Sequence, residues 1–557
     1  MINRTIPLAV LSLAFAACAP AAAPSTGPTP DQPRAGGTPT LPAGPLDAAP
    51  ESWWLLDEPS GRVLGTATER AYREILAGRQ PARTVVVAVL DSGIEIDHPD
   101  LTGSVWTNSD EVAGNGVDDD RNGYVDDVHG WNFIGGPDGR NVEQDTYEMT
   151  RLYRQLQTRF AGVRPDTLSA SARADYELAL AAAEEYRIEL AEKTDLLEQI
   201  EGIATIVKRS TDILKAHLGT DSLSEARVAA IQPNRADVAQ AQSVYLQMAR
   251  QGITEKAVEG DLQTLREMVE YNLNPEFDPR PIVGDDYGDL SQRVYGNNDV
   301  EGPTAEHGTH VAGIIAATRG NGIGIDGIAS AAQIMSVRTV PDGDERDKDV
   351  ANAIRYAVDN GAHIINMSFG KGYSPEKEAV DAAVAYAAER GVLLVHAAGN
   401  DAEDLTTEAN FPTRTFADGG MASNWIEVGA TSWEAAPDLV ATFSNYGQSA
   451  VDVFAPGVDI LSTVPEGVYE ENSGTSMAAP VVSGIAALIM AYYPDLTAEQ
   501  VRRIILESAT RHSDVRVDVP GASRDRVPFG TLSATGGIVN AYEALRLAAQ
   551  TSPQASN

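Results

Sequence analysis

The sequence predicts an α/β fold built on a largely parallel sheet. Residues 85–90 (VVVAVL) form a continuous apolar run, which is typical of a strand that is buried on both faces. A second apolar run, GVLLVHAAGN (391–400), has the pattern of another strand and the turn after it. A third, APVVSGIAALIMAYY (479–493), indicates a buried helix, because it is too short to span a membrane.

The chain begins with a predicted export signal, residues 1–18. An apolar stretch runs to Phe15, and small residues precede Cys18, which is the only cysteine. The apolar stretch has about ten residues, half of a bilayer span, so it is not predicted to be a transmembrane helix. Cys18 resembles the lipidated cysteine of bacterial lipoproteins. Phe15 departs from the usual aliphatic residue, which leaves ordinary signal-peptide cleavage after Ala16 or Ala17, without lipidation, as the alternative.

Two segments separate this signal from the first strand. Residues 19–48 are rich in Pro, Ala, Gly and Thr, which predicts a disordered tether. Residues 49–83 include ESWWLL and a helical stretch, and they are too few for a separate domain of their own. We expect this segment to pack on the domain that follows through Trp53, Trp54 and Leu55. At the other end of the chain, residues 547–557 are predicted to form a tail.

An acidic loop, AGNGVDDDRNGYVDDVHGWNF (113–133), follows the first strand. Its oxygen-bearing side chains alternate and are followed by a glycine, as in calcium loops, where ligands two residues apart face one ion. The twelfth position, His129, is not the glutamate of an EF-hand. The alternative is a solvated turn held by its own hydrogen bonds. The predicted ligands of a structural Ca²⁺ are Asp118, Asp120, Asn122, Tyr124, Asp126 and Asp127.

A helical insertion is predicted at residues 143–294. This stretch has helical periodicity, many strong helix formers, and no proline between Pro165 and Pro233. Three roles remain open on the sequence: a solvated cap, substrate gating or partner recognition, and self-inhibition.

Three short motifs, far apart in the chain, contain an aspartate, a histidine and a serine. Asp91 ends TVVVAVLDSG (84–93), His307 begins HGTHVAGIIAA (307–317), and Ser476 lies in SGTSMAAP (473–480). A serine hydroxyl needs a base to take its proton, and an imidazole held by a carboxylate is such a base. HGTH alone could suggest two metal ligands, but it lacks the spacing and the glutamate of zinc protease helices.

The order Asp, His, Ser along the chain resembles that of the subtilisin-like serine proteases, peptidase family S8. The resemblance covers residues 84–142 and 295–546, and includes INMSFG (365–370), FSNYG (443–447), FAPGVDILST (454–463) and GGIVNAYEAL (536–545). It implies a doubly wound, mostly parallel α/β catalytic domain, interrupted by the helical insertion, that cleaves peptide bonds through an acyl-enzyme.

The same resemblance implies further site residues. Asn400 and the backbone N–H of Ser476 are expected to form the oxyanion hole. One segment is expected to pair with the substrate backbone, and a second to form the wall and base of the pocket for the residue before the cut. The first segment is Ser368, Phe369 and Gly370, and the second is Ala397, Ala398, Gly399 and Asn410.

Charge restricts the partners of this 557-residue chain. It has 42 basic and 80 acidic residues, a formal net charge of −38, which excludes nucleic acids and anionic membrane surfaces. We therefore expect a serine endopeptidase acting on polypeptides, without an organic cofactor. It would be exported and either secreted or attached to the cell envelope, in the outer membrane or periplasm, by its lipid anchor only. The alternative is a catalytically idle envelope binding protein on the same fold; oligomeric state is not predicted.

Overall fold

The computed structural model describes residues 46, 48–58, 62–522 and 525–552. The predicted export signal, Cys18 and nearly all of the tether lie outside these residues. The chain divides into two compact units, the first comprising Met1–Glu148 and Pro279–Asn557, and the second comprising Met149–Asp278. The second unit lies within the stretch predicted as a helical insertion.

A nine-stranded sheet is the centre of the first unit. All neighbouring strands are parallel except the edge pair β10–β13. The strand order is β10 (Thr510–Arg511), β13 (Gly537–Ile538), β7 (Val453–Pro456), β6 (Trp425–Thr431), β5 (Leu393–Ala397), β4 (Ile364–Met367), β1 (Val85–Asp91), β3 (Ala332–Arg338) and β2 (Gly130–Asn132). Two short antiparallel hairpins accompany it, β8 (Ile460–Val464) with β9 (Val468–Asn472) and β11 (Arg516–Asp518) with β12 (Arg526–Pro528).

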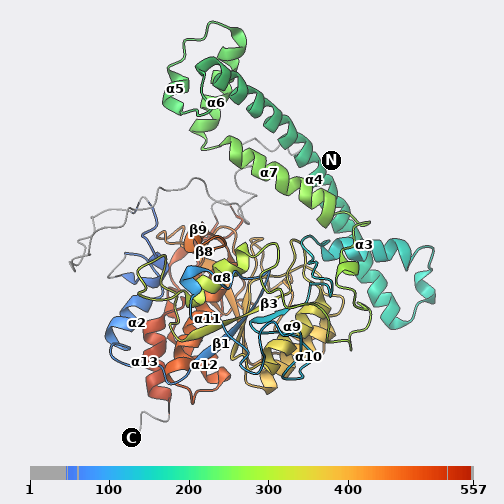
Figure 1. Ribbon diagram of the computed structural model, residues 1–557, viewed down its shortest axis with the longest axis vertical. Coiled ribbons are helices and arrows are strands. Elements are labelled where there is room, and N and C mark those ends of the chain that lie inside the picture. The colour runs from blue at the N-terminus through green and yellow to red at the C-terminus, as the bar shows by residue number, and fades with distance from the viewer. Residues whose placement is uncertain (1–45, 47, 59–61, 523–524, 553–557) are drawn as a thin grey trace. The chain divides into compact units, whose positions relative to one another are not determined.

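Helices cover both faces of this sheet. Val85, Val87 and Val89 of β1 belong to the core that contains α8 and α11, whereas Ala88 and Leu90 belong to the core that contains α9 and α10. Figure 1 shows β1 and β3 between these groups of helices. The predicted doubly wound α/β fold is therefore confirmed. The helices of this unit are α2 (Thr68–Glu74), α8 (Glu306–Ala316), α9 (Asp347–Asp359), α10 (Lys377–Glu389), α11 (Thr475–Tyr492), α12 (Ala498–Ser508) and α13 (Ala541–Thr551).

The segment before β1 is part of the main core. Trp53, Trp54 and Leu55 are buried among residues of the sheet, α8 and α11, and the Trp53 indole donates to the carbonyl of Val458 at 3.0 Å. The Ala541 N–H, at the start of α13, donates to the carbonyl of Thr66 at 2.8 Å. The segment therefore packs on the first unit as the sequence led us to expect.

The second unit is helical. Helix α3 (Glu148–Thr158) leads into it, and α4 (Ala170–Leu218) has 49 residues, which corresponds to roughly 73 Å at 1.5 Å per residue. Helices α6 (Ala236–Arg250) and α7 (Glu255–Glu267) both pack against α4, as Figure 1 shows. The small core at one end joins α4 to α5 (Glu225–Ala229) and α6, and contains Leu214, Val228, Ile231, Val238 and Ala241.

Helix α11 begins four residues before the apolar run 479–493, so it is longer than the sequence led us to expect. It is the single helix among the described residues that is long and apolar enough to cross a membrane. In this structure 94% of its apolar window is buried. It packs against β4, β5, β6 and β7, so burial in the core of the unit accounts for its composition.

A glycine allows α8 to approach the end of β1. A Cβ atom at Gly308 would lie 2.1 Å from the carbonyl oxygen of Gly93 and 3.2 Å from Cβ of Asp91. Because both contacts are with fixed parts of the fold, any larger residue at position 308 would force α8 and β1 apart.

We expect Gly308→Ala to destabilise the first unit by about 1–3 kcal/mol, because the added methyl group overpacks this contact. All six tryptophans lie in the first unit, so urea unfolding followed by tryptophan fluorescence measures its stability. Gly372→Ala is the control, since nothing lies within 4 Å of a Cβ atom built there. Equal unfolding midpoints for the two variants would show that α8 can shift without cost.

Candidate active site

Asp91 and His307 are hydrogen-bonded. Asp91 is the last residue of β1 and is 2% exposed, and His307 is the second residue of α8. The imidazole Nδ1 donates to Asp91 Oδ1 at 2.7 Å, and the Ser92 N–H donates to the same oxygen at 2.7 Å. With its Nδ1 proton held in this way, the neutral His307 ring presents Nε2 as a proton acceptor.

The charges around His307 favour its protonated form. Burial alone would lower the pKa of His307, but the charge and hydrogen bond of Asp91, together with the charge of Glu306, raise it above its ordinary value. The second histidine of the motif differs: burial lowers the pKa of His310 to about 3, and its Nε2 donates to the carbonyl of Glu470. His310 is therefore a neutral structural residue.

Ser476 is the second residue of α11, which begins after Gly474. Its hydroxyl donates to the carbonyl of Ser368 at 3.1 Å, so His307 is not its acceptor in this structure. Catalytic hydrogen bonds are often long or absent before substrate binds. The Ser476 N–H has no acceptor among the described residues, as expected in the first turn of a helix.

Asn400 lies beside that free N–H. A Cβ atom at Gly474 would be 3.6 Å from both Asn400 Nδ2 and Ser476 N, which shows that the two donors are near each other. Thr475 fixes the amide orientation, because its N–H and its hydroxyl both donate to Asn400 Oδ1 at 2.9 Å. The Thr475 hydroxyl also accepts from the Gly399 N–H at 3.1 Å. Thr475 was not predicted, although it stands next to Ser476 in the motif.

The segments expected to hold the substrate are joined to each other. The backbones of Lys371 and Phe411 exchange two hydrogen bonds, of 3.1 and 2.8 Å. Asn410 donates to the carbonyl of Ala397 at 3.0 Å, and a Cβ atom at Gly370 would lie 2.1 Å from its Oδ1. The Asn410 amide therefore lies against Gly370, which joins the two segments.

A cleft of about 930 Å³ brings the candidate carboxylate, base and nucleophile together. Asp91, His307 and Ser476 line it, with Ser368 and Asn400. The other residues expected to contact substrate, which are Phe369, Gly370, Ala397, Ala398, Gly399 and Asn410, are not among the described residues that line it.

Buried ion pairs support the segment after Ser368. The Lys371 ammonium, 1% exposed, contacts Glu148 at 2.9 Å and Asp347 at 2.8 Å and donates to the Glu345 carbonyl. Burial raises the pKa of the Glu345 side chain to about 8. A buried lysine between two carboxylates is stable only while all three keep their places, so this group fixes the backbone that follows Ser368.

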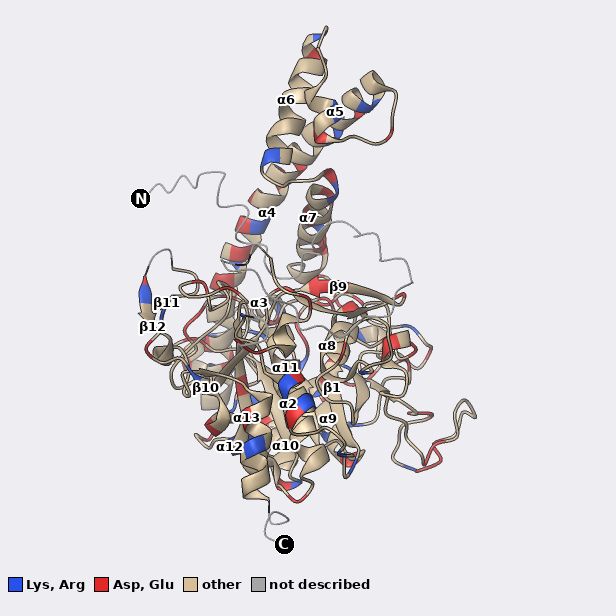
Figure 2. Ribbon diagram, turned by 90° about the vertical axis from the view of Figure 1, so that its left-hand side faces the viewer, with Lys and Arg blue, Asp and Glu red and all other residues tan. Residues whose placement is uncertain are grey.

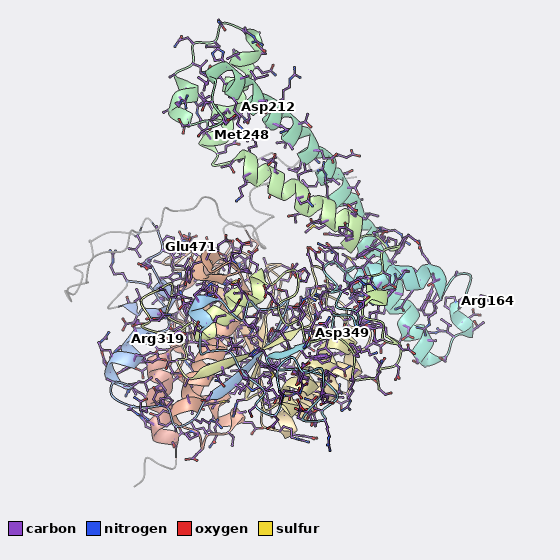
Figure 3. The ribbon with its side chains drawn as sticks, in the orientation of Figure 1. Arg164, Asp212, Met248, Arg319, Asp349 and Glu471 are labelled. Carbon is purple, nitrogen blue, oxygen red and sulfur yellow. The ribbon has the colours of Figure 1, made fainter. Side chains whose placement is uncertain are left out.

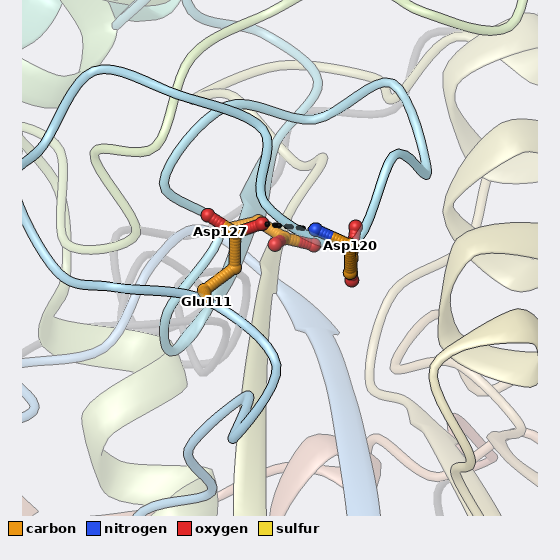
Figure 4. Close-up of side chains that lie close together, drawn as sticks. All are labelled: Glu111, Asp120 and Asp127. Atoms are coloured by element: carbon orange, nitrogen blue, oxygen red, sulfur yellow. Dashed lines mark hydrogen bonds between the residues drawn. The ribbon is translucent and has the colours of Figure 1, made fainter.

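The acidic loop brings three carboxylates together. Oxygens of Glu111, Asp120 and Asp127 all lie within 4.8 Å of one another (Figure 4). Glu111 Oε1 accepts from the Asp119 and Asp120 N–H groups, whereas its buried Oε2 has no hydrogen-bond partner among the described residues. Glu111 was not predicted, because it precedes the alternating pattern.

Other predicted ligands of the loop form its internal bonds. Asp118 accepts from the Asn122 and Gly123 N–H groups, and Asp126 accepts from Asn115 and Gly116. The Asn122 amide donates to both Asp120 and Asp127.

Tyr124 and Tyr356 connect this loop to the core. Tyr124 is buried, and its ring packs edge-on against that of Tyr356. The Tyr356 hydroxyl donates to Asp127 at 2.7 Å. Burial nevertheless raises the pKa of Asp127 to about 6, against the opposing effect of its hydrogen bonds from Tyr356, Asn122 and Asn108.

Comparison with known proteins gives one family and several relatives. Residues 82–526 match the family model described as the Subtilase family. A thermophilic serine proteinase from Bacillus sp. (strain AK1) is 40% identical over 217 residues, which are 39% of this chain and 48% of that protein. Subtilisin BL from Lederbergia lenta is 38% identical over 206 residues, 37% of this chain and 70% of that protein. Subtilisin E from Bacillus subtilis (strain 168) is 38% identical over 210 residues, 37% of this chain and 51% of that protein. The chain thus spans about half the length of the first and third of these relatives.

We expect Glu306→Gln to lower the pKa of His307, because it removes a negative charge that favours the imidazolium. Titration of the His307 ring by NMR measures this pKa in the folded protein. Glu378→Gln, an exposed position on α10, is the control and should leave the pKa unchanged. An unchanged pKa in Glu306→Gln would mean that solvent screens the Glu306 charge completely.

Proposed function

This chain belongs to the subtilase family, and on that premise we propose that it is a serine endopeptidase that hydrolyses peptide bonds in proteins. The observation that carries the proposal is that one cleft is lined by the Asp91–His307 pair, Ser476 and Asn400. These groups supply a nucleophile, a base with its orienting carboxylate, and donors for a developing oxyanion.

In the first half of the reaction Ser476 Oγ attacks the substrate carbonyl carbon. The hydroxyl turns away from the Ser368 carbonyl and gives its proton to His307 Nε2, while Asp91 stabilises the resulting imidazolium. The negative charge on the former carbonyl oxygen is held by Asn400 Nδ2 and the Ser476 N–H. When the C–N bond breaks, His307 gives the proton to the leaving amine, and an ester remains on Ser476.

In the second half water replaces the amine. His307 takes a proton from the attacking water, and the same two donors hold the second oxyanion. The ester C–O bond then breaks, and His307 returns the proton to Ser476 Oγ, so that the free acid leaves and the enzyme is restored. No organic cofactor takes part in either half.

We also propose that the acidic loop binds a structural Ca²⁺. Calcium is bound by oxygens at 2.3–2.6 Å, so two ligands on opposite sides of one ion are about 4.8 Å apart. The oxygens of Glu111, Asp120 and Asp127 meet this limit, and none of the three forms an ion pair with a Lys or Arg among the described residues. A divalent cation would neutralise these carboxylates and give the Glu111 Oε2 atom a partner.

The proposed location is the cell envelope. The signal-like residues 1–18 support export, Cys18 with its preceding small residues supports a lipid anchor, and residues 19–48 provide a tether between the anchor and the enzyme. The proposed contact with the membrane is through this lipid only.

We expect Ser476→Ala to lower kcat for a casein substrate by about 10⁶, a magnitude taken from a subtilisin example and transferred here. In parallel, a fluorophosphonate probe should label the folded wild-type protein at Ser476 and leave Ser476→Ala unlabelled. Circular dichroism of both proteins checks that the variant is folded. A folded wild-type protein that is neither labelled nor active would support a binding protein on this fold instead.

Calcium at 100 times its Kd should stabilise the first unit by about 2.7 kcal/mol, if the unfolded chain does not bind it. Urea unfolding with excess calcium and with EDTA, followed by tryptophan fluorescence, measures the difference. We expect Glu111→Gln to remove most of it, because one of the three carboxylates is lost. Asp110→Asn, an exposed neighbour outside the cluster, should keep it. Identical wild-type curves with calcium and EDTA would reduce the loop to a hydrogen-bonded turn.

A further inference from the structure

The charged Asp, Glu, Lys and Arg side chains that line the catalytic cleft are all acidic. The seven acidic residues are Asp91, Glu306, Asp342, Asp459, Glu466, Glu470 and Glu471, and no Lys or Arg is among the described residues that line the cleft. Asp91 is committed to His307, and Asp459 accepts from the indole of Trp433 at 2.8 Å. Of the remaining five, Asp342 follows the end of β3, and the other four lie on two adjoining elements, the start of α8 and the β8–β9 hairpin.

Four of these side chains form what we call the acidic rim: Glu306, Glu466, Glu470 and Glu471. None of them forms an ion pair among the described residues, and Glu306, Glu466 and Glu471 are exposed. The pKa of Glu306 is raised by its desolvation and by the charge of Glu470. The rim therefore holds uncompensated negative charge, and a cation placed against it would relieve the repulsion between its members.

The rim is held rigidly beside His307. The hydroxyls of Ser462 and Thr463 on β8 donate to the carbonyls of His310 and Thr309 on α8, both at 2.7 Å. From α8, His310 donates to the carbonyl of Glu470 on β9 at 3.1 Å. Three hydrogen bonds thus fix the hairpin to the helix that begins at Glu306. Figure 2 shows Asp and Glu on β9, and Figure 3 places Glu471 at the edge of the first unit.

The proton transfer from His307 to the leaving amine determines which side of the scissile bond lies against the acidic rim. His307 must reach the leaving amine to protonate it, so the residues after the cut pass beside His307. Glu306 adjoins His307 in sequence, and Glu470 is tied to the same helix. The segment expected to pair with the residues before the cut begins at Ser368, directly after β4, and so lies on a different element from the rim.

We propose that the acidic rim selects polypeptides that carry Lys or Arg within the first few residues after the scissile bond. This inference rests on the proposed endopeptidase function and names its substrate class. Long basic side chains suit the rim, because their ammonium or guanidinium groups can reach exposed carboxylates while the backbone stays in the cleft. Several fixed charges of one sign in a cleft raise the association rate of a charged ligand, and salt reduces the effect.

The test uses two internally quenched peptides that are identical up to the cut and carry either two Lys or two Glu at the second and third positions after it. We expect kcat/KM for the Lys peptide to be roughly tenfold higher at low ionic strength, and the ratio to fall in 0.5 M salt. In the triple variant Glu466→Gln, Glu470→Gln, Glu471→Gln the ratio should fall toward one. Glu306 is left intact, because it also acts on His307.

A matched control separates the rim from overall charge. Glu378→Gln, Glu389→Gln and Glu507→Gln change the net charge equally at exposed positions on α10 and α12. This control should keep the wild-type ratio. Equal cleavage of both peptides by the wild-type enzyme, or the same Lys preference in the rim variant and the control, would overturn the inference while the proposed function stands. Failure to cleave either peptide, with no fluorophosphonate labelling, would overturn the proposed function and the inference with it.

Discussion

The close packing of α8 against the end of β1 is the constraint on which the candidate site depends. β1 lies inside the sheet between β3 and β4. Leu90 is paired with both neighbours, and Asp91 directly after it is paired with Arg338 of β3. Because Gly308 has no side chain, α8 comes close enough to β1 for His307 to form a hydrogen bond with Asp91. Helix α11 packs against the same sheet and carries Ser476 in its first turn, so three distant segments meet at one edge.

Buried ion pairs fix the backbone of the first unit at the two positions where the chain leaves it and returns to it. Glu148, the last residue before the departure, contacts Lys371 at 2.9 Å, and Arg280, the second residue after the return, contacts Asp349 at 2.6 Å. Breaking one partner of such a pair leaves an uncompensated charge in a medium that solvates it poorly. The first unit therefore keeps its own structure at these points, and Lys371 connects one of them to the segment that contains Ser368.

The large acidic excess of the chain appears in two different physical settings. Around Asp127 three carboxylates lie close together in a largely enclosed loop, and the buried Glu111 Oε2 atom has no hydrogen-bond partner among the described residues, which supports the small cation proposed above. On the β8–β9 hairpin the carboxylates are mostly exposed at the edge of an open cleft, which is the setting of a larger and mobile partner. The two groups of carboxylates therefore differ in how deeply they are buried and how open they are to solvent, more than in the number of their charges.

The sequence by itself predicted the parallel sheet, the buried helix and the candidate catalytic residues, because each of these is visible in a short stretch of neighbouring residues. Apolar runs identify β1, β5 and α11, and Asp91, Asn400 and Ser476 stand next to the ends of these elements, where motifs are visible. Only the tertiary structure decided which distant residues meet. It brought Glu111 to Asp120 and Asp127, joined Thr475 to Asn400, and set Glu470 beside Glu306. Such contacts depend on how loops close and how elements pack, and a residue's local pattern carries no record of the partner that packing will give it.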